Sequence, residues 1–261
     1  MRNFRFLPLL LVCVPLLAGA QTLSPSYTFT TETFAPVLQA LPEQFRAAVQ
    51  ANPQAFLEDY LPLLGQPDDL LLLVDKKHEL PSDYEPSDLV PLRAPAFDVT
   101  RGDLRFRKAY VPALAALTSA AKKEGLRLAL SSSYRSWIYQ RDLFQRYVNK
   151  DGLATAERYS ARPGQSQHQL ATVIDFGSVT PDFADTREGK WLTAHAGEYG
   201  FSLSFPQGLE TLTGYVWEPW HYRYIGREAC AVQAKWFGGV QQYLTEFHDA
   251  EAKVLKAALK K

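Results

Sequence analysis

The stretch Ser166-Gln167-His168-Gln169-Leu170-Ala171-Thr172-Val173-Ile174-Asp175 joins a polar start to a β-branched run that ends in an aspartate. An aspartate inside an apolar strand is costly unless it is paired or bound to a metal. The separation of seven between His168 and Asp175 does not place them on one helical face, where three or four is needed. It suits a histidine at the end of a loop and an aspartate at the far end of the next strand. We therefore predict a central strand over 171–176 that carries half of a polar site.

The second half of this site is predicted in Trp217-Glu218-Pro219-Trp220-His221-Tyr222. Catalytic zinc takes three protein ligands and keeps a fourth position for water, and His168, Asp175 and His221 would form such a set. Pro219 interrupts strand alternation and can bring Glu218 and His221 to one cavity. A glutamate beside a metal is typically the base that takes a proton from metal-bound water. The alternative is a set of ordinary polar residues around an aromatic patch, and spacing alone leaves both open.

Arg135 is the third candidate element of the site, at the predicted turn from a strand to a helix in Ser131-Ser132-Ser133-Tyr134-Arg135-Ser136. Gln140 follows about one helical turn later. An arginine at the entrance of a site can clamp a carboxylate bidentately or stabilise an oxyanion. A surface ion pair is the alternative interpretation for a single arginine.

Hydrophobic periodicity predicts an α+β fold, with a small central antiparallel sheet and flanking helices that carry a single zinc site. We expect a signal peptide over 1–20, a small helical N-terminal appendage over 21–69 and a catalytic domain over 70–261 that ends in one long helix. The other elements that we expect are helices over 104–124, 134–148, 191–199 and 229–259, strands over 126–131, 201–205 and 215–224, and loops over 80–91 and 150–167.

The charge balance and the N-terminal segment indicate which partners and which compartment to expect. The 261 residues carry 28 basic and 28 acidic side chains, which argues against nucleic acid as a main partner. A short basic segment, an apolar run over 6–17 and Ala18-Gly19-Ala20 are typical of a secretory signal, and a buried first helix is the alternative. The run is shorter than the ~20 residues of a membrane span. We therefore expect an exported protein of the periplasm or cell envelope, with no transmembrane segment in the mature chain.

Cleavage after Ala20 would also remove Cys13 and leave Cys230 as the one remaining cysteine of the mature chain. No intrachain disulfide is then possible, although the compartment would permit one. A cysteine-type zinc site is excluded for the same reason, so histidine and carboxylate must supply the ligands.

Together, these segments resemble the zinc D-alanyl-D-alanine and L,D-carboxypeptidases of the VanY type. The family motif Ser-x-His-x-x-Gly-x-Ala-x-Asp is similar to the stretch from Ser166 to Asp175. Its second motif, Glu-x-Trp-His, is intact from Glu218 to His221. The family's Ser-x-Tyr-Arg-Ser segment with a downstream glutamine matches the stretch 131–140. The resemblance covers roughly 72–226, with three motifs in the family's order.

The resemblance implies one Zn²⁺ per chain, held by His168, Asp175 and His221. It implies Glu218 as the general base and Arg135 as the group that polarises the scissile carbonyl or stabilises its oxyanion. The implied substrates are peptidoglycan stem peptides, and the implied reaction is removal of a terminal D-alanine. The residues that would line the substrate cleft are Ser133, Gln140, Ser166 and Trp220.

Three departures from the family pattern affect substrate preference. Ala171 and Val173 replace the usual glycine and alanine between two expected ligands, which makes this strand bulkier. Ser204-Phe205-Pro206 stands where the family commonly has an arginine and a tyrosine before the proline. The sequence leaves open D,D- or L,D-specificity, the role of the N-terminal appendage and the oligomeric state. A peptidoglycan endopeptidase and a cell-wall-binding protein without turnover remain as alternatives.

Overall fold

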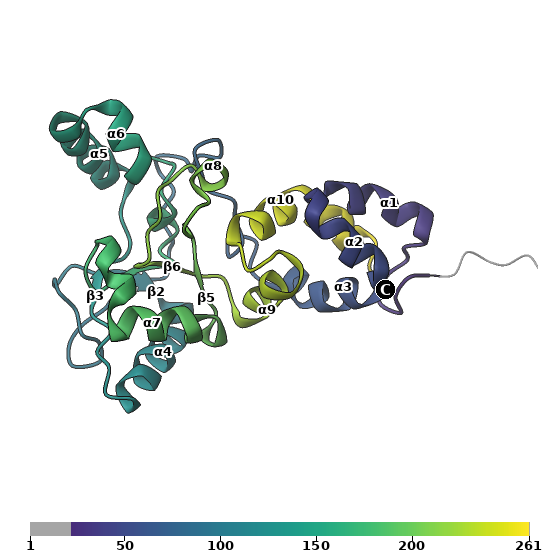
Figure 1. The fold of residues 1–261 in the computed structure, drawn as a ribbon, viewed down its shortest axis with the longest axis horizontal. Coiled ribbons are helices and arrows are strands. Elements are labelled where there is room, and N and C mark those ends of the chain that lie inside the picture. Colours follow the sequence, from purple (N-terminus) through teal and green to yellow (C-terminus); the bar gives the residue numbers. More distant parts are fainter. Residues whose placement is uncertain (1–21, 261) are drawn as a thin grey trace, which may run out of the picture.

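The computed structural model describes residues 22–260, and the expected signal peptide over 1–20 lies outside these residues. The molecule is elongated, with a helical end formed by both ends of the chain and a mixed end that contains the sheet (Figure 1). Each end has its own large cluster of buried hydrophobic side chains. Across residues 22–260, no helix has the length and apolar character needed to cross a membrane.

The helical end begins with short helices whose limits follow proline and threonine signals. Thr30 caps the first helix with a reciprocal capping box, and Pro53 occupies the first turn of the third. Near the chain ends, the backbone N–H of Thr28 donates to the carbonyl of Ala258 at 2.8 Å. The elements of this end are α1 (Thr31–Ala40), α2 (Glu43–Ala51), α3 (Pro53–Tyr60), η1 (Leu61–Gly65), α9 (Arg227–Trp236) and α10 (Gln241–Ala257).

The prediction of one long helix over 229–259 is wrong, because the segment forms α9 and α10 with a break between them. Gly238 and Gly239 lie at the break with φ of 60° and 75°. Glycine adopts this left-handed conformation without steric cost, and a residue in this conformation commonly ends a helix. The break lets α9 and α10 pack on each other and on the N-terminal helices around a shared core. Cys230 is buried in that core, where burial raises the pKa of its thiol to about 12.

The central sheet contains four antiparallel strands in the order β3-β4-β6-β5, so the predicted α+β fold with a small antiparallel sheet is confirmed. As expected, β4 is an inner strand and is buried along its whole length. The register places Asp175 of β4 directly opposite His221 of β6. The strands are β3 (Leu130–Ser132), β4 (Val173–Phe176), β5 (Phe201–Leu203) and β6 (His221–Tyr224).

Helices flank this sheet on separate sides in Figure 1, with α4 and α7 on one side and the pair α5–α6 on the other. The helices are α4 (Val111–Lys123), α5 (Trp137–Asp151), α6 (Leu153–Tyr159), α7 (Arg187–His195) and α8 (Glu210–Thr213). The mixed end also contains short 3-10 helices, which are η2 (Lys108–Tyr110), η3 (Gln167–Leu170), η4 (Pro181–Asp185) and η5 (Ala196–Tyr199).

Several predicted boundaries are wrong, and backbone pairing between distant segments explains two of them. The helix expected from 104 begins at Val111, because β2 (Arg105–Arg107) pairs with β1 (Leu89–Pro91) in a second small sheet. That pairing also gives the end of the expected loop over 80–91 a strand conformation. The expected loop over 150–167 contains α6. The predicted strand over 215–224 is regular only in β6, since Pro219 has no N–H to donate to a ladder.

Candidate metal centre

The fold brings together the three predicted ligands from three different elements. His168 lies in η3, Asp175 in β4 and His221 in β6. One candidate ligand atom from each lies within 4.8 Å of the others, and all three side chains are buried. His168 Nε2 is 3.3 Å from Asp175 Oδ2, and His221 Nδ1 is 3.3 Å from Asp175 Oδ1. The carboxylate therefore lies between the two imidazoles, with one oxygen toward each.

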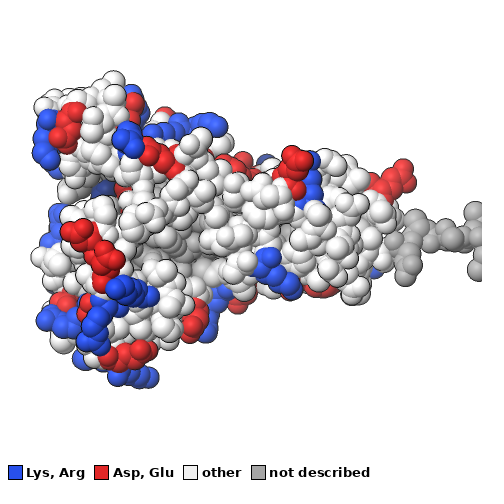
Figure 2. All heavy atoms as spheres, in the orientation of Figure 1, with Lys and Arg blue, Asp and Glu red and all other residues white. Residues whose placement is uncertain are grey.

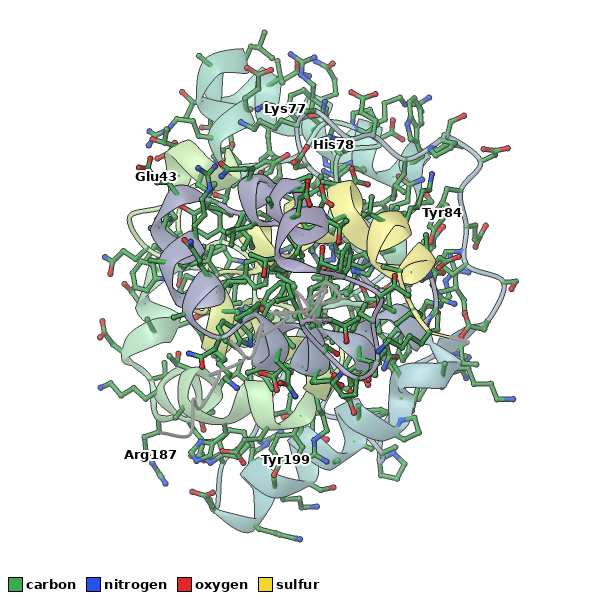
Figure 3. All side chains as sticks on the ribbon, turned by 90° about the vertical axis from the view of Figure 1, so that its right-hand side faces the viewer. Glu43, Lys77, His78, Tyr84, Arg187 and Tyr199 are labelled. Carbon is green, nitrogen blue, oxygen red and sulfur yellow. The ribbon has the colours of Figure 1, made fainter. Side chains whose placement is uncertain are left out.

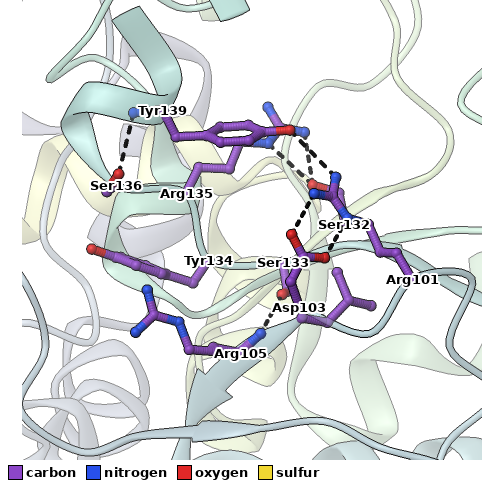
Figure 4. Close-up of a pocket in the computed structure, with 10 residues that line it drawn as sticks. Arg101, Asp103, Arg105, Ser132, Ser133, Tyr134, Arg135, Ser136 and Tyr139 are labelled. Atoms are coloured by element: carbon purple, nitrogen blue, oxygen red, sulfur yellow. Dashed lines mark hydrogen bonds and ion pairs between the residues drawn. The ribbon is translucent and has the colours of Figure 1, made fainter. Parts of the chain in front are cut away.

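Hydrogen bonds on the outer side of His168 orient its ring. Its Nδ1–H donates to the carbonyl of Ser133 at 2.6 Å, which leaves the Nε2 lone pair directed at the site. The hydroxyl of Ser166 accepts from the backbone N–H of His168 at 3.3 Å, at the start of the η3 turn. The side chain of Ser133 is engaged elsewhere, since its hydroxyl accepts from the N–H of Arg105 at 3.0 Å (Figure 4).

The protonation states suit a divalent cation. Burial lowers the pKa of both His168 and His221 to about 4, so both rings are neutral at pH 7. Burial alone would raise the pKa of Asp175, but the two imidazoles and Arg135 outweigh it and lower that pKa below its ordinary range. Neutral imidazole and ionised carboxylate are the forms that bind metals. Within the described part of the chain, Asp175 Oδ1 and His221 Nε2 are buried without a hydrogen-bond partner.

Glu218 lies beside the triad, with its Oε2 3.2 Å from His221 Nδ1. Its backbone is held on both sides, because its N–H donates to the carbonyl of Phe205 and its carbonyl accepts from the N–H of His221, both at 3.0 Å. Burial, followed by the nearby charge of Asp175, raises the pKa of Glu218 to about 8. A carboxyl group with this environment can hold and release a proton near neutral pH.

Arg135 occupies the opposite wall of the site. Its Nη2 donates to Asp175 Oδ2 and to the hydroxyl of Ser132, both at 2.9 Å, and its Nη1 reaches Gln140 Oε1 at 3.5 Å. Its backbone N–H donates to the carbonyl of His168 at 3.2 Å. Arg135 also lines a small pocket of about 200 Å³, together with Ser133 and Tyr134. Figure 4 draws the residues that line this pocket.

An open cleft of about 620 Å³ leads to the triad, and Arg135, Ser166, Glu218 and Trp220 are among the residues that line it. Its outer part is formed by side chains of the α5–α6 pair, such as Tyr159. Figure 2 shows the molecule hollowed between this pair and the part that contains β3 and α7, with basic and acidic side chains interspersed on the face. The cleft is therefore open to solvent, and both basic and acidic side chains lie around it.

Two predicted substrate-binding residues lie outside the lining of this cleft. Ser133 is 1% exposed and lines the small pocket of Figure 4 instead. Gln140, also 1% exposed, donates from Nε2 to the carbonyl of Ala161 at 2.7 Å and thereby ties α5 to the segment that precedes Ser166. In the structure, both residues support neighbours of the cleft by hydrogen bonds.

The sequence agrees with a known family over this same region. The family model described as VanY, D-alanyl-D-alanine carboxypeptidase, matches residues 103–227. The bifunctional D-Ala-D-Ala dipeptidase and D-Ala-D-Ala carboxypeptidase VanXYC of Enterococcus gallinarum is 30% identical over 196 residues, which cover 71% of this chain and 97% of that protein. The chain belongs to the VanY family.

Other relatives agree with this family assignment. A putative carboxypeptidase, YodJ of Bacillus subtilis (strain 168), is 38% identical over 181 residues, which cover 67% of this chain and 66% of YodJ. The solved structure of the LdcB LD-carboxypeptidase superposes with a TM-score of 0.60 at 34% identity, covering 69% of this chain and 86% of that one. A mutant of the D,D-pentapeptidase VanY in complex with Zn(II) gives a TM-score of 0.56 at 27% identity, covering 68% and 99%.

Two positions that depart from the VanY pattern have structural consequences. Ala171 ends η3 in the left-handed region with φ of 55°, a conformation that favours glycine, the residue expected there from the family motif. Ser204 is buried, and its hydroxyl bonds to Gln167 Oε1 at 2.8 Å and to Gln241 Oε1 at 3.3 Å. The hydroxyl of Ser204 thus connects α10 to Gln167, the residue that precedes His168.

The buried amide network around Ser204 was not predicted from the sequence. Gln241 also donates from Nε2 to the carbonyl of Ser202 at 3.4 Å, and Gln242 donates to Asp75 Oδ2 at 2.9 Å. In the sequence, the signal that could have indicated this network is the pair of consecutive glutamines, Gln241 and Gln242, at the start of an amphipathic helix. Asp75 also contacts His78, whose Nδ1 lies 2.8 Å from Asp75 Oδ1. His78 belongs to a surface loop beside Lys77 (Figure 3).

Proposed function

We propose that this protein is an exported, zinc-dependent carboxypeptidase that removes a terminal D-alanine from peptidoglycan stem peptides. The observation that carries the proposal is the buried triad of His168, Asp175 and His221 with Glu218 and Arg135 on opposite sides. All five side chains meet at one cleft that is open to a peptide.

Zinc suits this set of donors. Two imidazole nitrogens and one carboxylate oxygen form a three-residue set of the kind used in catalytic zinc sites. The buried Asp175 Oδ1, which faces His221 Nδ1, has no hydrogen-bond partner in residues 22–260, and such an atom is costly unless a ligand or a solvent molecule satisfies it. When bound, zinc would act as a Lewis acid and lower the pKa of coordinated water to roughly 7.

The residues around the proposed metal would transfer the proton, stabilise the oxyanion and form the wall of the cleft. Glu218 takes the proton from the attacking water and can return it to the departing amine, because its carboxyl lies beside the proposed metal ligand His221. Arg135 holds Asp175 in place, and the one Nη1–H without a partner among the described residues is available to the carbonyl oxygen that becomes negative during attack. Ser166 and Trp220 form part of the cleft wall, while Ser133 and Gln140 position their neighbours.

The relatives supply the substrate class of the proposal. One structural neighbour is VanYB in complex with D-alanine-D-alanine, which superposes with a TM-score of 0.56 at 27% identity. Relatives are named as D,D- and as L,D-carboxypeptidases, so the proposal covers both tetrapeptide and pentapeptide stems. Export rests on the signal-like segment over 1–20, which would deliver the enzyme to the polymer.

The test combines metal analysis with defined muropeptides. Mature protein should contain about one zinc per chain, whereas His168→Ala should lose the metal; full occupancy in this variant would disprove the ligand assignment. Mass spectrometry of the products should detect free D-alanine and a stem shortened by one residue. Cleavage inside the stem or a cross-link would identify an endopeptidase instead, and zinc-loaded protein without any cleavage would favour a wall-binding role.

A further inference from the structure

The hydroxyl of Tyr215 is a buried polar group with no partner among the residues that the structure describes. Tyr215 is 4% exposed, and it lines the same cleft as the triad. Buried hydroxyls are normally hydrogen-bonded, because an unpaired one loses its interactions with water without replacement. Two other cleft residues, Asp175 and His221, carry unpartnered buried atoms, and both belong to the proposed metal centre.

The ring of Tyr215 is held firmly without any contribution from its hydroxyl. It packs on Phe205 with ring centroids 4.9 Å apart, and Phe205 packs in turn on His221 at 4.7 Å. The ammonium of Lys76 lies 4.8 Å from the Tyr215 ring centroid. The hydroxyl of Thr213 bonds to both the N–H and the carbonyl of Tyr215, at 3.3 and 3.1 Å. The phenol oxygen is thus presented by a rigid support.

The charge near this phenol keeps it a hydrogen-bond donor. Burial, and then the carboxyl of Glu218, raises the pKa of Tyr215 well above its ordinary value. The group therefore stays protonated throughout the pH range in which a peptidase acts. Its neighbour Phe205 has no polar atom, so this wall of the cleft otherwise offers aromatic surface to a substrate.

We propose that Tyr215 is a substrate-binding residue, whose hydroxyl donates a hydrogen bond to an oxygen of the bound peptide. The acceptor is either a main-chain carbonyl beside the scissile bond or the terminal carboxylate, since both are oxygens that a carboxypeptidase substrate must bring into this cleft. The inference rests on the proposed function and adds a residue to it.

The test is Tyr215→Phe, which removes the oxygen and leaves the ring. Because that oxygen has no protein partner, the variant should keep its zinc content and unfold at the same or a higher temperature than the wild type. Its kcat/KM on a D-Ala-D-Ala peptide should fall by about 10- to 100-fold, the range of ~1.4–2.7 kcal/mol expected for a lost hydrogen bond to substrate. Peptide affinity, measured in an inactive Glu218→Ala background, should weaken in parallel.

Tyr27→Phe is the matched control, because Tyr27 is also a buried tyrosine whose hydroxyl lacks a partner within residues 22–260, but it belongs to the core of the helical end. Its activity and peptide affinity should stay at wild-type values. A C-terminal amide substrate separates the two acceptors, since a loss confined to the free acid assigns the carboxylate and an equal loss assigns a carbonyl.

Two outcomes would overturn the role of Tyr215. Unchanged peptide affinity and kcat/KM in Tyr215→Phe would show that the hydroxyl does not touch the substrate. A loss of stability or zinc equal to the loss of activity would show a structural role. Absence of peptide cleavage by the zinc-loaded wild type would instead refute the proposed function, so the two failures are distinguishable.

Discussion

Replacing Glu218 by glutamine should make the metal-free protein more stable at alkaline pH and should slow hydrolysis by the zinc-loaded protein. Glutamine has the size of the glutamate side chain but carries no charge. The wild-type carboxyl is 8% exposed and lies next to the ionised Asp175, so its ionised form is disfavoured in the folded chain. A neutral amide removes this penalty without changing the packing.

The magnitude follows from the pKa of Glu218, which rises from an ordinary 4.5 to about 8 on folding. The folded protein binds the proton more tightly than the unfolded chain, so this contribution to stability is complete below pH 4.5 and is lost as the pH rises through 8. At 1.36 kcal/mol per unit, the full loss is at most about 5 kcal/mol, and relaxation of the site reduces it to an effect of roughly 2–5 kcal/mol.

Urea unfolding of the chelator-treated proteins at pH 5, 7 and 9 measures this effect. The free energy of unfolding of Glu218→Gln should exceed that of the wild type at pH 9, with a difference that shrinks toward pH 5. An exposed change, Glu228→Gln, should leave a difference that does not vary with pH. With zinc restored, Glu218→Gln should lose about 10²- to 10⁴-fold in kcat. A variant that is less stable than the wild type at pH 9, or that keeps its activity, would refute the reasoning.

Three further predictions concern residues around the site and in the helical end. Gln241→Leu should lower the free energy of unfolding by about 1–3 kcal/mol, since it leaves Ser204 without one partner, whereas the exposed Gln145→Leu should change urea unfolding little. Burial lowers the pKa of His248 to about 4, so the free energy of unfolding should fall as the pH drops from 6.5 to 4. His248→Gln should reduce this dependence on pH in urea unfolding, and a variant with the same dependence as the wild type would contradict the prediction. Arg135→Gln should retain zinc but lose about 10²- to 10³-fold in kcat, measured by release of D-alanine; loss of the metal would show that Arg135 acts through Asp175.

The local sequence was most informative where backbone chemistry acts over a few residues. Thr30 and Pro53 lie at the starts of α1 and α3 in the predicted helical appendage, and the β-branched run before Asp175 identified β4. The boundaries failed where a distant partner decides the conformation. Arg105–Arg107 forms a strand because β1 pairs with it, and no periodicity within 104–124 contains that information.

The sequence alone was enough to recognise the family and to predict the metal ligands and Glu218 as the base, because His168, Asp175 and His221 stand in short motifs whose chemistry is specific. How these residues meet depends on tertiary packing. The antiparallel register sets Asp175 opposite His221, and α10 reaches Ser204 behind η3. Contacts of this kind join segments that lie far apart in the chain, so they depend on packing rather than on local pattern. Tyr215 is the clearest case, because a tyrosine that lines the cleft becomes a candidate for substrate binding only when its hydroxyl is found buried and unpartnered within the described chain.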